Sequence, residues 1–216
     1  MQCCLPNDSR TVHPVLKQIH SQDAVVTEIQ NLMLPDEADY LRQHANKQGF
    51  EASTVAAENG GNATDNRRTS RTSFLPKDRD PVIDCIGKRI ATVAGQPVTH
   101  MEPMQVTDYK HKQEYKAHHD YFGNKNDPDR TMTVFAYLQS EGCDEGKCGG
   151  ATAFYNLKDE RGQALRVFPR PGNAVMWSNR THTGDVNPMT LHSGEKLTCA
   201  RARKVGLNAW FRDAKW

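Results

Sequence analysis

Several features that would narrow a protein's function are missing from this sequence. Its 216 residues contain no run of about 18 apolar residues, which argues against a membrane-spanning helix. Lys and Arg number 28 and Asp and Glu number 26, so the net charge of +2 is too small to indicate nucleic acid as a partner. The first residues lack the basic, apolar and small-residue order of a signal peptide, so we expect a soluble chain, although a leader could have been removed. Source, compartment and oligomeric state stay open.

The six cysteines are similarly uninformative. None belongs to a CxxC pair, and a chain of this length does not need disulfides to fold, so they indicate no redox compartment. Cys143 and Cys148 flank a short loop and could close a disulfide or stay reduced. Half of a zinc site is less favoured because no second pair follows.

The length fits one domain with a substantial core. Residues 1–23 show no sustained period and are predicted to form a loose N-terminal segment, followed by a single domain over residues 24–216. The first ten residues of this domain are rich in β-branched side chains and predict a strand. Residues 34–49 predict a helix, because a proline and two acids begin the segment and a glycine ends it.

A long polar loop is predicted next, over residues 53–76, which are rich in Ser, Thr, Asn and Gly. A second helix is predicted over residues 80–95, since Asp80 can cap it, Pro81 takes its first position and apolar residues recur at helical spacing. Seven short extended runs then follow, around residues 104–112, 114–122, 131–140, 150–156, 165–170, 173–179 and 204–212. The order predicts an α+β fold, mainly β: a sandwich or barrel with the helices packed on one side.

The chemistry is concentrated in "YKAHHDYF", residues 115–122. In a strand, side chains two apart share a face, so His118 and Asp120 project together and His119 points away. A third metal ligand must come from later in the chain, where His182 and His192 are the candidates. Two histidines and a carboxylate are the ligands of non-haem Fe(II) oxygenases. An HxD pair alone is weak support, because histidines and aspartates often meet by chance.

Further segments raise the specificity of this interpretation. The runs "QVTDYKHKQEYKAHHDYF", "GGATAF", "VFPRPGNAVMWSN", "LHSGEK" and "RKVGLNAWF" occur in this order, with "LPDEADYL" and "RTSF" before them. Together they resemble the prolyl 4-hydroxylase branch of the Fe(II)/2-oxoglutarate dioxygenases over roughly residues 24–214. The resemblance implies a double-stranded β-helix, also called a jelly roll or cupin-like core. It further implies the cofactors Fe(II), 2-oxoglutarate and O2, with L-ascorbate as reductant.

The resemblance also assigns site residues. His118, Asp120 and His192 correspond to the metal ligands, with "LHSG" preferred to the segment around His182. Lys204 corresponds to the lysine that pairs with the 5-carboxylate of 2-oxoglutarate, with Arg201 or Arg203 as substitutes if the strand register slips. The remaining residues assigned to 2-oxoglutarate are Tyr109 and Thr152, and those assigned to the substrate or the pocket wall are Tyr115, Arg71 and Trp210. Tyr115 lies on the opposite strand face from His118 by parity, so a local twist or bulge is required.

The function implied is hydroxylation of proline in a polypeptide, with oxidative decarboxylation of 2-oxoglutarate to succinate and CO2. Three alternatives remain. One is an oxygenase of the same fold acting on a free amino acid or another protein side chain. The others are a zinc hydrolase with the same three ligands and a non-catalytic cupin-like binding module. The sequence does not identify the target protein.

Overall fold

The computed structural model describes residues 1–20, 24–56, 62–76, 79–122, 129–142 and 146–216. In these residues the strands form an eight-stranded sheet, a four-stranded sheet and one separate hairpin, with antiparallel pairing throughout. The large sheet contains, in spatial order, β1 (Val15–His20), β2 (Val26–Gln30), β12 (Ala174–Ser178), β9 (Arg130–Glu141), β14 (Arg203–Arg212), β7 (Gln105–Lys110), β6 (Arg71–Phe74) and β3 (Glu51–Ala52). The small sheet contains β11 (Ala164–Val167), β10 (Thr152–Lys158), β13 (His192–Gly194) and β8 (Tyr115–His118), and the hairpin pairs β4 (Thr54–Ala56) with β5 (Asn62–Thr64).

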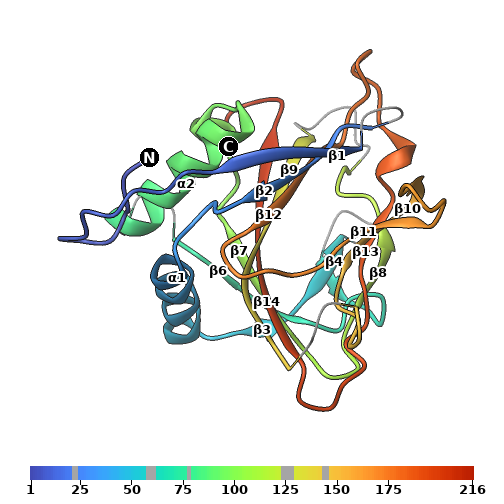
Figure 1. Cartoon of the computed structure of the whole chain (residues 1–216), viewed down its shortest axis with the longest axis horizontal. Coiled ribbons are helices and arrows are strands. Elements are labelled where there is room, and N and C mark those ends of the chain that lie inside the picture. The colour runs from blue at the N-terminus through green and yellow to red at the C-terminus, as the bar shows by residue number, and fades with distance from the viewer. Residues whose placement is uncertain (21–23, 57–61, 77–78, 123–128, 143–145) are drawn as a thin grey trace.

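Two helices, α1 (Pro35–Gln48) and α2 (Pro81–Ala94), cover one face of the large sheet (Figure 1). Helix α2 begins where Asp80 accepts hydrogen bonds from the backbone N–H groups of Val82 and Ile83, at 2.9 and 3.0 Å. It ends at Gly95, which adopts a left-handed conformation with φ of 64°. Both predicted helices are therefore confirmed, as is their packing on one side. None of the described helices has the length and apolar character needed to cross a membrane.

Strand β14 contributes side chains to the packing on both faces of the large sheet. Its residues Val205, Leu207 and Phe211 are buried with the helices in one hydrophobic core. Side chains on a strand alternate between faces, so Lys204 and Trp210 project to the other side, where they line a pocket together with residues of the small sheet. A second core lies between the sheets and includes aromatic residues of β9, β10 and β12. Two antiparallel sheets enclosing a pocket form the predicted jelly roll.

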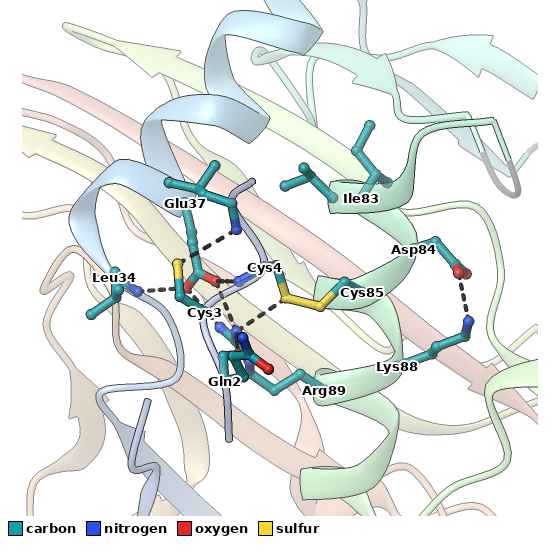
Figure 2. The surroundings of a disulfide bond; sticks show 12 residues. Gln2, Cys3, Cys4, Leu34, Glu37, Ile83, Asp84, Cys85, Lys88 and Arg89 are labelled. Carbon is teal, nitrogen blue, oxygen red and sulfur yellow. Dashed lines mark hydrogen bonds and ion pairs between the residues drawn. A yellow bond between two sulfur atoms is a disulfide. The ribbon is translucent and has the colours of Figure 1, made fainter. Parts of the chain in front are cut away.

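The N-terminal segment is not loose, contrary to the prediction. Strand β1 pairs with β2 at the edge of the large sheet, and Cys4 forms a disulfide with Cys85 of α2 (Figure 2). The side chains of β1 are exposed or only partly buried on both faces of the strand, so no alternation of apolar and polar residues marks it in the sequence. The prediction for residues 21–23 lies outside the described residues.

Two further predictions need correction, one about a loop and one about a strand. Residues 53–76 do not form one continuous loop, since β4, β5 and β6 lie within them; residues 57–61 are outside the described part. Each of the seven predicted extended runs overlaps a strand, but β13 was missed because it has only three residues. This short strand is nevertheless important, because it begins with His192.

Candidate functional site

The site is built on two strands that pair side by side in the small sheet. His118 ends β8, His192 begins β13, and the two residues are direct partners in the strand register. Asp120 follows two residues after His118 and is 7% exposed. One ligand atom from each of the three residues lies within 4.8 Å of the others. The structure therefore brings His192 together with His118 and Asp120, which precede it by about seventy residues in the sequence.

Backbone carbonyls orient both imidazoles of this triad. The Nδ1 atom of His118 lies 2.8 Å from the carbonyl oxygen of Lys116, and that of His192 lies 2.9 Å from the carbonyl oxygen of Thr190. When Nδ1 donates to a carbonyl, Nε2 retains its lone pair and can bind a metal. The Nε2 atoms lie 3.5 and 3.7 Å from the Asp120 carboxylate oxygens, so all three lone-pair donors converge.

The environment favours the protonation states that bind a cation. Burial, together with the nearby His118, lowers the pKa of His192 to about 4, so the ring of His192 is neutral at neutral pH. Burial alone would raise the pKa of Asp120, but the neighbouring histidines outweigh it and hold that pKa below its ordinary value. A buried carboxylate facing two imidazoles is the donor set for a divalent metal.

Two residues that the sequence did not identify hold the carboxylate in place. The hydroxyl of Thr133 in β9 donates to Oδ2 of Asp120 at 2.8 Å. The side-chain amide of Asn179 donates to the same hydroxyl at 3.0 Å. Both residues are almost fully buried. No sequence signal marks them, because a threonine within a strand most often simply packs.

Two other histidines lie outside the triad. His119 follows His118, but its ring packs against Tyr121 at a centroid distance of 4.9 Å rather than among the ligand atoms. His182 is exposed in the turn between β12 and β13. The structure thus agrees with the preference for His192 over His182.

Lys204 lies at the other end of the same pocket. Its side chain is 1% exposed, and its Nζ donates to the carbonyl oxygen of Gly150 at 2.7 Å. The Nζ atom also lies 4.8 Å from the centroid of the Tyr109 ring. The substitutes considered from sequence lie elsewhere: Arg203 is paired with Asp108 at 2.9 Å, and Arg201 is exposed. Lys204 is therefore a buried cation at the wall of the pocket.

Tyr109 and Thr152 line the same pocket as the triad and Lys204. The Thr152 hydroxyl lies 2.9 Å from the hydroxyl of Tyr137, a fully buried residue that the sequence did not indicate. Asn208 of β14 also lines the pocket and was not predicted. Its period-two spacing from Lys204 is the signal that could have identified it.

Tyr115 reaches the site through an irregularity in β8. The register between β8 and β13 shifts between the His118–His192 and Tyr115–Gly194 pairs, so three steps on β8 oppose two on β13. This is the bulge that strand parity requires. The Tyr115 ring consequently stacks on His118, with centroids 3.5 Å apart and planes 15° apart. Burial raises the pKa of Tyr115 to about 12, so its hydroxyl remains protonated and can donate a hydrogen bond.

A groove adjoins the pocket and shares Tyr115, Asp120 and Trp210 with it. The guanidinium of Arg130 lies 3.6 Å from the centroid of the Trp210 ring and is held by the buried Glu102. Trp210 is thus a wall of both cavities.

Arg71 does not lie at this site, contrary to the assignment from sequence. Its guanidinium donates to the carbonyl oxygen of Phe50 and stacks on that ring, and it lines neither the pocket nor the groove. Within the same polar stretch of the sequence, it is Arg68 that lines the groove, with its guanidinium 4.8 Å from the centroid of the Tyr115 ring. Arg68 precedes β6 in a segment whose backbone bonds to β8, whereas Arg71 lies within β6.

Comparisons with known proteins agree with this geometry. Residues 104–212 match the sequence profile of the 2OG-Fe(II) oxygenase superfamily. The chain is 34% identical to Probable prolyl 4-hydroxylase 10 of Arabidopsis thaliana over 202 residues, which covers 84% of this chain and 66% of that protein. It is 32% identical to Probable prolyl 4-hydroxylase 3 of the same plant, covering 86% of this chain and 68% of that protein. The chain thus spans about two thirds of the curated relatives it matches.

Solved structures show the same fold. The viral collagen prolyl hydroxylase of Paramecium Bursaria Chlorella virus-1, in complex with 2OG, superimposes with a TM-score of 0.68 at 23% identity. The match covers 88% of this chain and 96% of the viral one. A prolyl hydroxylase of Trichoplax adhaerens, in complex with a hypoxia inducible factor peptide fragment, gives a TM-score of 0.62 at 16% identity, over 87% of this chain and 83% of that one.

Proposed function

Because this chain belongs to the prolyl 4-hydroxylase family of the 2OG-Fe(II) oxygenase superfamily, we propose that it is an Fe(II)- and 2-oxoglutarate-dependent dioxygenase that hydroxylates proline in a polypeptide. One observation carries the proposal. A single pocket has a three-residue metal-ligand set at one end and a buried lysine at the other. This arrangement fits a dicarboxylic 2-oxo acid that chelates a metal through its 1-carboxylate and 2-oxo group.

The residues present fit the metal. His118, Asp120 and His192 offer two neutral nitrogens and one carboxylate oxygen, and three ligands from one side leave coordination positions open. The carbonyls of Lys116 and Thr190 fix the ring orientation, and Thr133 fixes the carboxylate. Such a set accepts several divalent ions, so bound zinc or manganese in a purified sample would not contradict the proposal.

The pocket also fits 2-oxoglutarate. A Cβ atom added at Gly194 would lie 3.6 Å from Nζ of Lys204 and 3.7 Å from the hydroxyl of Tyr109, so the missing side chain leaves space beside both donors. A buried carboxylate needs a cation and hydrogen-bond donors to offset its lost hydration. We assign Lys204 and Tyr109 to the 5-carboxylate of 2-oxoglutarate, with Thr152 on the pocket wall opposite Gly194 in the strand register.

When bound, Fe(II), 2-oxoglutarate and O2 together supply the oxidising chemistry, which releases succinate and CO2 and transfers a hydroxyl group to carbon. The protein's own contribution is binding and orientation. The triad would hold the metal, and Lys204 would pair with the 5-carboxylate of the co-substrate. Tyr115 presents a protonated hydroxyl above His118, on the side of the groove.

The substrate class is assigned from the groove. Tyr115, Trp210, Phe122 and the guanidinium groups of Arg68 and Arg130 line it beside Asp120. Extended proline-rich chains lie readily in grooves lined by aromatic rings and hydrogen-bond donors. A zinc hydrolase or a non-catalytic binding module would have no use for a buried lysine aligned with the metal ligands in one pocket.

The test is succinate formation from 2-oxoglutarate with Fe(II) and ascorbate, with and without a proline-rich peptide. We expect turnover in the wild type that the peptide stimulates, and none in Asp120→Ala. Mass spectrometry should show one added oxygen atom on the peptide's proline. Absence of turnover with every peptide tried would contradict the hydroxylase, and turnover that ignores the peptide would contradict the substrate class.

A further inference from the structure

The second disulfide of the protein lies beside the pocket. Cys148 precedes β10, and its sulfur is bonded to that of Cys199 in the turn before β14. Cys148 is 5% exposed and belongs to a small apolar cluster with Tyr109, Leu197 and Ala202, against which Tyr115 packs. The loop disulfide considered from sequence, between Cys143 and Cys148, does not form in this structure, because Cys148 is bonded to Cys199; Cys143 lies outside the described residues.

Backbone contacts bring the same two segments together. The N–H of Thr198 donates to the carbonyl oxygen of Cys148 at 2.9 Å, and Gly149 forms an isolated bridge with Leu197. Gly150 adopts φ of 81°, and a Cβ atom there would lie 2.7 Å from Cδ2 of Leu197. The chain from Cys148 to Gly150 is therefore held closely against the segment before β14.

The carbonyl oxygen of Gly150 accepts a hydrogen bond from the Lys204 ammonium. A lysine side chain has a flexible four-carbon stem, so its Nζ is positioned by the groups it contacts rather than by its backbone. That carbonyl is only two residues from Cys148. The disulfide, the Gly150 carbonyl and Nζ of Lys204 thus form a short chain of contacts.

We propose that the Cys148–Cys199 disulfide is a positioning element for co-substrate binding: it fixes the Gly150 carbonyl and, through it, the Lys204 ammonium that pairs with the 5-carboxylate of 2-oxoglutarate. This inference rests on the proposed function, because it assumes that Lys204 pairs with that carboxylate. Cys148 and Cys199 do not touch the co-substrate. Their loss should weaken 2-oxoglutarate binding by about tenfold, the scale on which removing a group that orients a ligand-binding residue acts.

The structure offers a matched control. The Cys4–Cys85 disulfide joins the N-terminal segment to α2, among residues that line neither the pocket nor the groove. We therefore compare Cys148→Ser/Cys199→Ser with Cys4→Ser/Cys85→Ser. Should the serine pair near the pocket fail to fold, Cys148→Ala/Cys199→Ala retains the apolar character of the cluster and takes its place.

The measurement is anaerobic titration of the Fe(II)-loaded protein, followed by the visible charge-transfer absorbance of a chelated 2-oxo acid. Two ligands are used: 2-oxoglutarate, and 2-oxobutanoate, which has no second carboxylate to reach Lys204. We expect the pocket-side variant to lose about tenfold in affinity for 2-oxoglutarate and to keep its affinity for 2-oxobutanoate. In steady state its KM for 2-oxoglutarate should rise while kcat stays the same, and the Cys4→Ser/Cys85→Ser variant should retain both constants.

Equal affinity for 2-oxoglutarate in the wild type and the pocket-side variant would overturn the inference and leave the proposed function intact. Parallel losses for both ligands would also overturn it, because the disulfide would then be maintaining the whole pocket. A wild type that binds no 2-oxoglutarate would overturn the proposed function itself.

Discussion

Buried charges lie on both sides of the large sheet, and their surroundings differ between the two sides. On the helix side, Arg89 of α2 is paired with Glu37 of α1, with N–O distances of 2.7 and 2.8 Å and exposures of 4% and 0% (Figure 2). The Glu37 carboxylate also accepts from the backbone N–H groups of Cys4 and Leu34. On the pocket side, Asp120 and Lys204 line a cavity instead.

The difference separates charges that serve the fold from charges that serve a ligand. Glu37 and Arg89 find their partners within the protein, which offsets their desolvation and joins the N-terminal segment to both helices. Asp120 and Lys204 are held in orientation by Thr133 and Gly150 but also face a space that a ligand can enter. Substitutions on the helix side should therefore change stability, and substitutions on the pocket side should change binding and turnover.

The largest expected effect is loss of the metal. His118→Ala should abolish succinate formation, because two remaining ligands hold a divalent ion poorly. Its unfolding temperature without metal should remain close to that of the wild type. The matched control is His119→Ala: this residue lines the groove but supplies no ligand atom, so the variant should retain Fe(II) binding and most of its succinate formation. Comparable turnover in the two variants would remove His118 from the ligand set.

Lys204→Ala should come next. Loss of the cation leaves the 5-carboxylate of the co-substrate without its partner, a cost of roughly 3–5 kcal/mol in 2-oxoglutarate binding. The KM for 2-oxoglutarate measures this effect. Arg203→Ala removes a cation from the neighbouring position of β14, where it is bonded to Asp108, and should leave the KM unchanged. A larger KM in the arginine variant than in the lysine variant would transfer the role to Arg203.

Glu37→Gln tests the helix side. It leaves the Arg89 charge buried without its counter-ion and should lower the free energy of unfolding by about 3 kcal/mol in urea denaturation. The KM for 2-oxoglutarate should not change at temperatures where the variant is folded. Asp39→Asn provides the control, since Asp39 forms an exposed pair with Arg42 on the same helix and should cost less than about 1 kcal/mol. Similar losses in both variants would contradict the importance of the buried pair.

The pH dependence of stability has a definite sign for this pair. Burial alone would raise the pKa of Glu37, but hydrogen bonds from Arg89, Cys4 and Leu34 outweigh it and lower that pKa. A carboxylate with a lowered pKa in the folded state stabilises above its unfolded pKa of about 4.3 and loses that contribution as the pH falls. The wild type should therefore lose stability on acidification more steeply than Glu37→Gln. Parallel stability curves would be inconsistent with this assignment.

The smallest expected effect is that of Thr133→Val on the pocket side. It removes the hydroxyl that donates to Asp120 and should weaken Fe(II) binding by about tenfold, or 1.4 kcal/mol. Thermal stability should also fall, by about 1–3 kcal/mol, because the buried amide of Asn179 loses the hydroxyl to which it donates. Fe(II) titration at fixed 2-oxoglutarate measures the effect. Unchanged metal affinity would show that Asp120 does not need this hydrogen bond.

The sequence predicted the elements with strong local signals. Helix α2 follows from Asp80, Pro81 and the apolar spacing after them, and the HxD pair follows from strand parity together with the family resemblance. What it did not predict depends on contacts between distant segments. The Cys4–Cys85 and Cys148–Cys199 disulfides join residues 81 and 51 positions apart, and no spacing rule identifies such partners.

The same limit explains the errors at single residues. Arg71 and Arg68 both lie in a polar stretch, and only the backbone pairing of Arg68 with Tyr115 shows which of them reaches the groove. Thr133 looks like any threonine in a strand until Asp120 lies beside it. β13 is too short to show a period, and its pairing with β8 and β10 defines it.

The two faces of β14 also restrict how this protein can change during evolution. Inserting or deleting one residue within the strand would exchange its faces, turning Lys204 toward the helices and Val205 into the pocket. Binding and stability would then be lost together. A change of one residue between Lys204 and Trp210 would therefore have to be absorbed by a β-bulge that restores the alternation.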